Sequence, residues 1–271
     1  MQQRLLALLL CLCAVPAFAQ RLPATVTPDH YDLWFAPDLD KETFRGRETI
    51  SLTVAAPTST ITLNAAEITF GTVTVESGGK TQPAQVSLNE KDETATFTVP
   101  AALQKGTAKV HIEYTGILNG QLRGFYLSKA NGRKYAVSQM EATDARRAFP
   151  CFDEPSFKAT FGVTLMVDSA DTAISNGRQV SDTPGPEPGK HTVVFAPTPK
   201  MSSCARRFWS ASRSAAASTS ALPMATTSVV GASLIGRRSG GCAAPRGLRT
   251  PVRDRGRGRG GRGPRRAAAD G

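Results

Sequence analysis

Residues 139–155 hold the side chains best suited to chemistry, at the point where the regular alternation of apolar and polar residues stops. The carboxylate of Glu141, two positions after the amide of Gln139, could bind a cationic ligand group through charge-assisted hydrogen bonds. The segment also permits a simpler interpretation, a solvated loop whose arginines pair with its own aspartates. Those pairs would involve Arg146, Arg147, Asp144 and Asp153. Chemistry alone favours this second interpretation.

The sequence carries no familiar metal-binding or nucleophile motif. Its three histidines, His30, His111 and His191, are far apart, and no H-E-x-x-H pair places two imidazoles on one helical face for zinc. No G-x-S-x-G, P-loop or G-x-G-x-x-G is present either. Cys151 has no histidine near it in the sequence, which favours a buried structural thiol over a nucleophile. We therefore expect no catalytic residue, metal site or cofactor within this chain.

The elements that position the segment are predicted to be strands, because apolar residues recur with period 2. The longest run is Phe161, Val163, Leu165 and Val167. Shorter runs are Tyr31/Leu33/Phe35, Ile50/Leu52/Val54, Ile61/Leu63, Val73/Val75, Val86/Leu88, Ala95/Phe97/Val99 and Val110/Ile112/Tyr114. Strands of this kind have one buried and one solvated face, which favours antiparallel pairing.

Turn residues separate the predicted strands. Residues 77–80 (Ser-Gly-Gly-Lys) and 131–132 (Asn-Gly) are typical of hairpin turns, and 175–177 (Ser-Asn-Gly) should supply positive φ values. Residues 184–189, rich in Pro and Gly, predict a surface loop before a last strand, and 141–149 predicts a helical turn. The expected fold class is all-β, a β-sandwich-like or saddle-like arrangement of two sheets.

The net positive charge of the chain comes from its last quarter. Residues 204–271 contain 14 arginines and two aspartates, a net charge of +12, which leaves −1 for the remainder of a chain whose total is +11. A nucleic-acid-binding fold is therefore not expected. This segment also lacks Lys, Glu, Gln, Asn, Tyr and His, and we predict a disordered Arg-rich tail at 204–271 after a domain at 20–203.

The N-terminal residues MQQRLLALLLCLCAVPAFAQ have the form of a secretory signal peptide, 1–19, cleaved near Ala19. The apolar run is too short to span a bilayer, and no later one reaches 18 residues, so no membrane span is expected. The mature protein would be periplasmic or extracellular. Only Cys151 would remain in the predicted domain, so no disulfide framework is available there.

Several motifs occur in a fixed order along residues 21–203. They are His30-Tyr31-Asp32-Leu33, Pro37-Asp38-Leu39, Phe44-Arg45-Gly46, Gly124-Phe125-Tyr126, Gln139-Met140-Glu141-Ala142, Pro150-Cys151-Phe152-Asp153-Glu154-Pro155, Ser175-Asn176-Gly177 and Thr198-Pro199-Lys200-Met201-Ser202-Ser203. On these motifs the chain resembles the aminopeptidase N-like zinc metallopeptidases (alanyl aminopeptidases). The resemblance covers only the N-terminal domain of that family, a β-saddle of two sheets that packs on a separate catalytic domain.

The resemblance implies roles for individual residues. Gln139, Glu141 and Ala142 would be substrate-binding positions, where the Glu141 carboxylate receives the free α-ammonium group of a peptide. It also implies a cis peptide bond between Glu141 and Ala142. Arg147 and Asp153 are candidates for a structural ion pair beneath that loop, an inference from the segment itself.

The sequence departs from the family after Ser203. The family continues with a Tyr-Leu-Val-like stretch, a G-x-M-E-N loop, H-E-x-x-H and a further zinc-binding Glu, and none of these follows Cys204 here. Read from the third base of the Phe208 codon, Phe208-Trp209-Ser210 becomes Leu-Val followed by a small or polar residue. The hypothesis is a frameshift, although a genuine secreted basic tail is the other interpretation.

The predicted function is therefore the substrate-recognition domain of an exported zinc aminopeptidase, inactive in the absence of its catalytic domain. Zinc is implied for the full-length family enzyme only. The expected partners are peptide N-termini, bound weakly, and a catalytic domain that would cover one face. The alternative is a stand-alone secreted β-module that binds peptide N-termini, or an anionic surface through its basic tail.

Overall fold

The computed structural model of the chain describes residues 21–205 and 208–212. The predicted signal peptide, 1–19, lies outside the described residues, as does most of the predicted tail. Within the described ranges, no helix is long and apolar enough to cross a membrane.

The largest sheet has nine strands in the order β13-β14-β11-β1-β2-β8-β4-β5, with β15 pairing beside β14 on β11. Its strands are β1 (Val26–Asp38), β2 (Thr43–Val54), β4 (Ile68–Ser77), β5 (Lys80–Pro83), β8 (Gly106–Ile117), β11 (Lys158–Asp168), β13 (Gln179–Pro184), β14 (Lys190–Phe195) and β15 (Met201–Ser202). The central strands are long because their apolar alternation continues over 10 to 13 residues.

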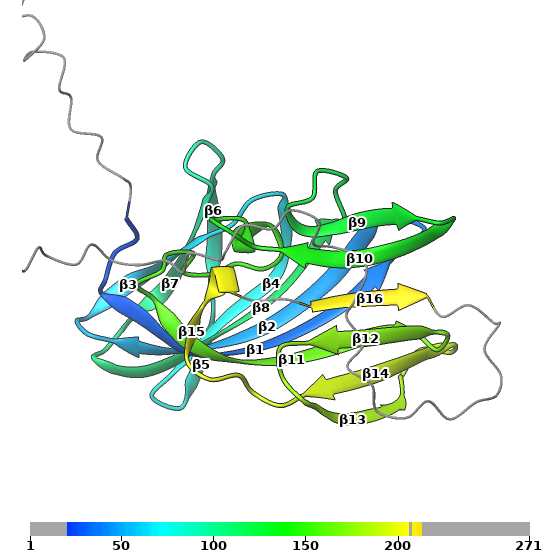
Figure 1. Ribbon diagram of the computed structural model, residues 1–271. Helices are drawn as coiled ribbons and strands as arrows, with labels where there is room; N and C mark the ends of the chain where they lie inside the picture. The colour runs from blue at the N-terminus through cyan, green and yellow to red at the C-terminus, as the bar shows by residue number, and fades with distance from the viewer. Residues whose placement is uncertain (1–20, 206–207, 213–271) are drawn as a thin grey trace, which may run out of the picture. The chain divides into compact units, whose positions relative to one another are not determined.

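Two smaller sheets lie over different ends of the long central strands (Figure 1). One contains β3 (Thr58–Asn64), β7 (Thr94–Leu103) and β6 (Gln85–Asn89). The other contains β12 (Asp171–Ser175), β16 (Phe208–Ser212), β10 (Arg133–Gln139) and β9 (Gly124–Ala130). Two short 3-10 helices, η1 (Ala145–Arg147) and η2 (Ser203–Ala205), complete the described elements. The predicted all-β, sandwich-like class is confirmed.

Aromatic side chains join each small sheet to the large one. Phe125 of β9 packs 5.1 Å from Phe44 and 5.6 Å from Phe35, measured between ring centroids. At the other small sheet, Phe97 of β7 lies 5.6 Å from Phe70 of β4. The two contacts belong to one continuous apolar core, which contains nearly all the predicted inward-facing residues.

The exception is Leu88, which is 54% exposed. Its strand, β6, is the outer strand of the three-stranded sheet, so only one neighbour is available to cover it. The hairpin turns at 77–80 and 131–132 form as predicted, with positive φ at Gly78, Gly79, Asn131 and Gly132.

Three further expectations are corrected. Strands β1 and β11 pair in parallel, which the long intervening chain permits. No residue of 175–177 has positive φ; Gly177 instead allows close approach, since a Cβ there would lie 2.1 Å from the Ala196 carbonyl oxygen. The fold also continues past Ser203, because β16 fills the position between β10 and β12 with backbone pairing to both.

Glu48 is an acidic residue inside the apolar core. It lies on β2, in register with Leu33 of β1 and Ile112 of β8, and is only 3% exposed. Among the described residues, neither of its carboxylate oxygens has a hydrogen-bond partner, and the same holds for the hydroxyl of Tyr114. Burial raises the pKa of Glu48 well above its ordinary value.

We predict that Glu48→Leu raises the free energy of unfolding at pH 7 by about 1–3 kcal/mol, because it removes an unsatisfied buried group. The pKa of Glu48 is higher in the folded state than in the unfolded state. The folded protein is therefore most stable, with respect to this group, below the unfolded-state pKa of about 4.3, and it loses stability as the pH rises toward the folded-state pKa. Urea unfolding between pH 4 and pH 8 should therefore show a smaller decline for the variant.

Glu113→Gln on the exposed face of β8 is the matched control and should leave the pH profile unchanged. A Glu48→Leu protein that is less stable than the parent at every pH would show that the carboxyl group has a stabilising partner.

Candidate functional site

The predicted binding segment begins at the end of β10. Gln139 is the last residue of that strand, half-buried, and pairs with Gly124 of β9. Met140 is buried at 1% exposure, and the peptide bond between Glu141 and Ala142 is cis, as the resemblance implied. Glu141 and Ala142 are both exposed, so the carboxylate of Glu141 is open to solvent.

The predicted helical turn follows directly. The amide of Asp144 donates to the carbonyl oxygen of Met140 at 3.1 Å, and η1 then covers Ala145–Arg147. Ala145, Ala148 and Phe149 are fully buried, which holds this turn against the core. The exposed Glu141–Ala142 unit thus lies between two anchored ends, a strand and a buried turn.

Two arginines of η1 form separate ion pairs. Arg146 donates from Nε to Asp153 at 3.1 Å, and Arg147 donates from Nε to Asp144 at 3.0 Å. The predicted pair of Arg147 with Asp153 is therefore wrong, and the pairing expected for a self-paired loop is the one observed. The ion pair at Asp153 is not solvated, however, because Asp153 is only 2% exposed.

The reason is geometric. Successive side chains of a 3-10 turn point about 120° apart, so only one of two adjacent arginines can face Asp153. Burial raises the pKa of the Asp153 carboxyl, while its bonds to Arg146 and to the hydroxyl of Ser203 act in the opposite direction.

Two acidic residues that sequence reasoning missed complete the surroundings of Arg147. Its guanidinium donates to Glu67 at 2.7 Å and also contacts Glu93, while Glu67 accepts from Arg123 at 3.2 Å as well. Burial alone would lower the pKa of Arg147, but Glu67, Asp144 and Glu93 raise it above its ordinary value. Glu67 and Glu93 are 80 and 54 positions from Arg147, so no local pattern pointed to them.

Cys151 is fully buried, and burial raises the pKa of its thiol well above the ordinary value. The prediction of a structural thiol is confirmed. Its backbone forms a bridge with Asn64 of β3, whose side-chain oxygen also accepts from the amide of Asp153.

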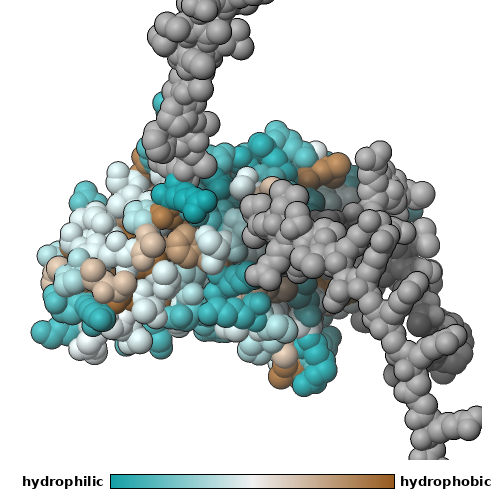
Figure 2. Space-filling view, turned by 60° about the vertical axis from the view of Figure 1, so that its left-hand side comes forward, coloured by the Kyte–Doolittle hydropathy of each residue, from teal (hydrophilic) through white to brown (hydrophobic). Residues whose placement is uncertain are grey.

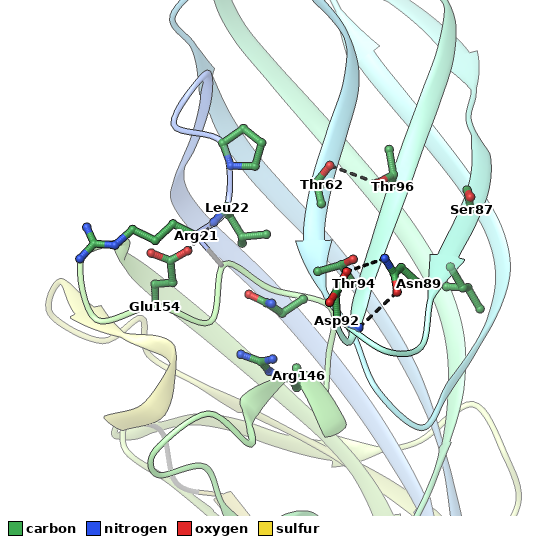
Figure 3. A pocket seen from close by; sticks show the side chains of 13 residues that line it. Arg21, Leu22, Thr62, Ser87, Asn89, Asp92, Thr94, Thr96, Arg146 and Glu154 are labelled. Carbon is green, nitrogen blue, oxygen red and sulfur yellow. Dashed lines mark hydrogen bonds between the residues drawn. The ribbon is translucent and has the colours of Figure 1, made fainter. Parts of the chain in front are cut away.

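A pocket of about 600 Å³ lies beside the site rather than within it (Figure 3). Hydroxyl and amide side chains of β3, β6 and β7 form one wall, the residues around Leu22 form another, and Arg146 lies at its base. Gln139, Glu141 and Ala142 do not line it. The exposed Glu141 carboxylate is thus presented on a surface and not in a closed cavity.

The described residues offer no metal site, since no three His, Cys, Asp or Glu side chains among them gather closely enough to hold an ion. His30 contacts Thr160 and Asp32, His111 contacts Thr49, and His191 contacts Asp182, each on a different part of the large sheet. Large apolar side chains are exposed at Leu88, Ile117, Leu122, Ile174 and Val180. On the face shown in Figure 2, hydrophobic residues form small groups among hydrophilic ones.

The chain is similar to known aminopeptidases. The model of the Peptidase M1 N-terminal domain matches residues 27–204. Puromycin-sensitive aminopeptidase of Caenorhabditis elegans is 36% identical over 201 residues, which are 70% of this chain and 21% of the relative. Aminopeptidase 2, mitochondrial, of Saccharomyces cerevisiae is 38% identical over 195 residues (67% of this chain, 20% of the relative), and Aminopeptidase M1-A of Oryza sativa subsp. japonica is 43% identical over 165 (58% and 19%).

The chain spans about a fifth of the length of these curated relatives. The matched region is the one that carries the ordered motifs, from β1 to the end of η2, and it includes the whole of the 139–155 segment. The chain therefore belongs to the Peptidase M1 family of aminopeptidases, through that family's N-terminal domain.

Proposed function

We propose that this domain recognises the free N-terminus of peptide substrates in an exported zinc aminopeptidase. Glu141, with Gln139 beside it, would bind the α-ammonium group, and Ala142 would complete that surface. The observation that carries the proposal is the exposed Glu141 carboxylate, held between the end of β10 and the buried turn η1. A carboxylate fixed in this way selects a cation through charge and hydrogen bonding, and so selects peptides with an unblocked amine.

The proposed recognition assigns no zinc ligand to this domain. The described residues do not fit a zinc site, and the sequence contains no H-E-x-x-H motif. The metal and the water that it activates would come from a catalytic domain like those of the longer relatives. No step of the proposed recognition uses a metal.

The 271-residue chain is expected to be inactive. With alanine p-nitroanilide and added zinc, it should release p-nitroaniline at the rate of buffer alone, and a chelator should change nothing, because water activation needs a bound metal. The absorbance of p-nitroaniline, recorded at a wavelength where the anilide substrate does not absorb, measures the release. Chelator-sensitive hydrolysis by the pure chain would overturn the proposal.

Amine binding by the isolated chain should be weak. A solvent-open carboxylate–ammonium contact contributes about 0–1 kcal/mol, so the Kd for a short alanine peptide amide should be millimolar or weaker. An NMR titration of the ¹⁵N-labelled chain should move the signals of residues 139–142, and the N-acetylated peptide should not. Glu141→Gln should abolish the effect, while Glu90→Gln, in an exposed turn, should preserve it.

Micromolar affinity in calorimetry, or equal shifts with the acetylated peptide, would contradict this assignment. The alternative, a secreted module anchored by its basic tail, predicts binding to anionic vesicles that weakens steeply with salt. The control for this experiment is a chain that ends after Ser212. A chain that ends after Ser203 would also lose β16, which pairs with β10 and β12 in the four-stranded sheet.

We further propose export through residues 1–19 and a reading-frame error near codon 204. In support of the frame error, the match to the family model ends at residue 204, and the chain after Ser203 contains no Lys, Glu, Gln, Asn, Tyr or His. Resequencing the gene across codons 195–230 should find an inserted or missing base, followed by an open frame that encodes H-E-x-x-H. A confirmed sequence without such a frame would establish the basic tail as a real part of the protein.

A further inference from the structure

We propose that Glu93, assisted by Glu67, is a positioning residue that sets the place of Glu141 by holding Arg147. This inference rests on the proposed amine-binding role of Glu141. Neither glutamate belongs to the 139–155 segment, and both reach it from turns at the ends of strands, Glu67 before β4 and Glu93 before β7.

The connection runs through a short series of contacts. Arg147 is bonded to Glu67 and Glu93 on one side and to Asp144 on the other. The amide of Asp144 donates to the carbonyl oxygen of Met140, the residue directly before Glu141. A shift of the guanidinium would therefore move the turn that ends the exposed Glu141–Ala142 unit.

Arg147 has little freedom to find another position. Its side chain is 9% exposed, and β9 closes one side, since a Cβ at Gly124 would lie 2.6 Å from the Cβ of Arg147. A buried guanidinium that loses a carboxylate partner leaves its charge uncompensated. The position of the Arg147 side chain thus depends on the carboxylates around it.

The backbone at the two glutamates is the second, independent observation. Glu67 has φ of 59° and Glu93 has φ of 51°, in the left-handed region where glycine is the intrinsically favoured residue. Both positions nevertheless carry a carboxylate, and both carboxylates converge on Arg147. Backbone preference therefore does not account for glutamate at these two positions.

Glu93 has the larger effect of the two because it joins both arginines of η1. One of its carboxylate oxygens contacts Arg147, and the other accepts from Arg146 at 3.2 Å. Arg146 in turn holds the buried Asp153. Removal of the Glu93 carboxylate therefore takes a partner from both arginines of the turn.

The test is hydrogen exchange on the full 271-residue chain without peptide. Glu93→Gln and Glu93→Gly should raise exchange of the hydrogen-bonded turn amides, those of Asp144 and residues 146–148, by about tenfold or more, while β1, β2 and β8 keep their protection. Glu93→Gly is informative because glycine favours this backbone, so its effect on the loop cannot come from a strained turn. Glu93→Asp should restore part of the protection.

Glu42→Gly is the matched control. Glu42 also has a left-handed backbone, with φ of 55°, and pairs with Lys129 on the surface, so this variant should leave 140–148 unchanged. The proposal is overturned if the Glu93 variants leave the loop protected, or if they raise exchange equally throughout the large sheet. Because no peptide is present, failure of amine binding would not affect this result.

Discussion

Each sheet of this domain has an apolar face that must be covered, and the arrangement of the domain follows from that requirement. Phe35 and Phe44 on the large sheet pack against Phe125 of β9, and Phe70 packs against Phe97 of β7. Each small sheet buries apolar side chains against the large sheet, and the removal of this apolar surface from water stabilises both sheets in place. The two small sheets in turn cover the core face of the large sheet. The 139–155 segment connects with both of them, at Gln139 of β10 and through the bridge of Cys151 with Asn64 of β3.

At this junction the fold buries a cluster of charged groups, distinct from the isolated Glu48 of the apolar core. Arg146 and Arg147 are largely buried, and four carboxylates, Glu67, Glu93, Asp144 and Asp153, compensate them. Because a buried charge without a partner is costly, every one of these groups is constrained by the others. The result is a cluster of mutually paired charged side chains, and the Glu141 carboxylate is exposed to solvent beside it. The proposed recognition of a peptide amine depends on this presentation of Glu141.

Much of the fold was predictable because strand alternation and hairpin turns are local. The runs at Tyr31, Ile50 and Phe161 are buried as expected, and the Asn131-Gly132 turn has its predicted conformation. The candidate site was predictable only through the ordered motifs, since the residue types alone favoured a solvated loop. The partner of Asp153 was not predictable, because adjacent arginines of a turn point in different directions and the sequence does not say which one faces inward.

The sequence by itself determined the strand content, the hairpin turns, the location of the candidate site and the family to which the domain belongs. These properties depend on side-chain periodicity, on turn residues and on the order of short motifs, all of which can be read along the chain. Only the tertiary structure decided that β1 and β11 run in parallel, that β16 completes the four-stranded sheet, and that Glu67 and Glu93 meet Arg147. Those contacts join residues more than thirty positions apart, and such pairings are set by how the sheets share their core, not by any local pattern.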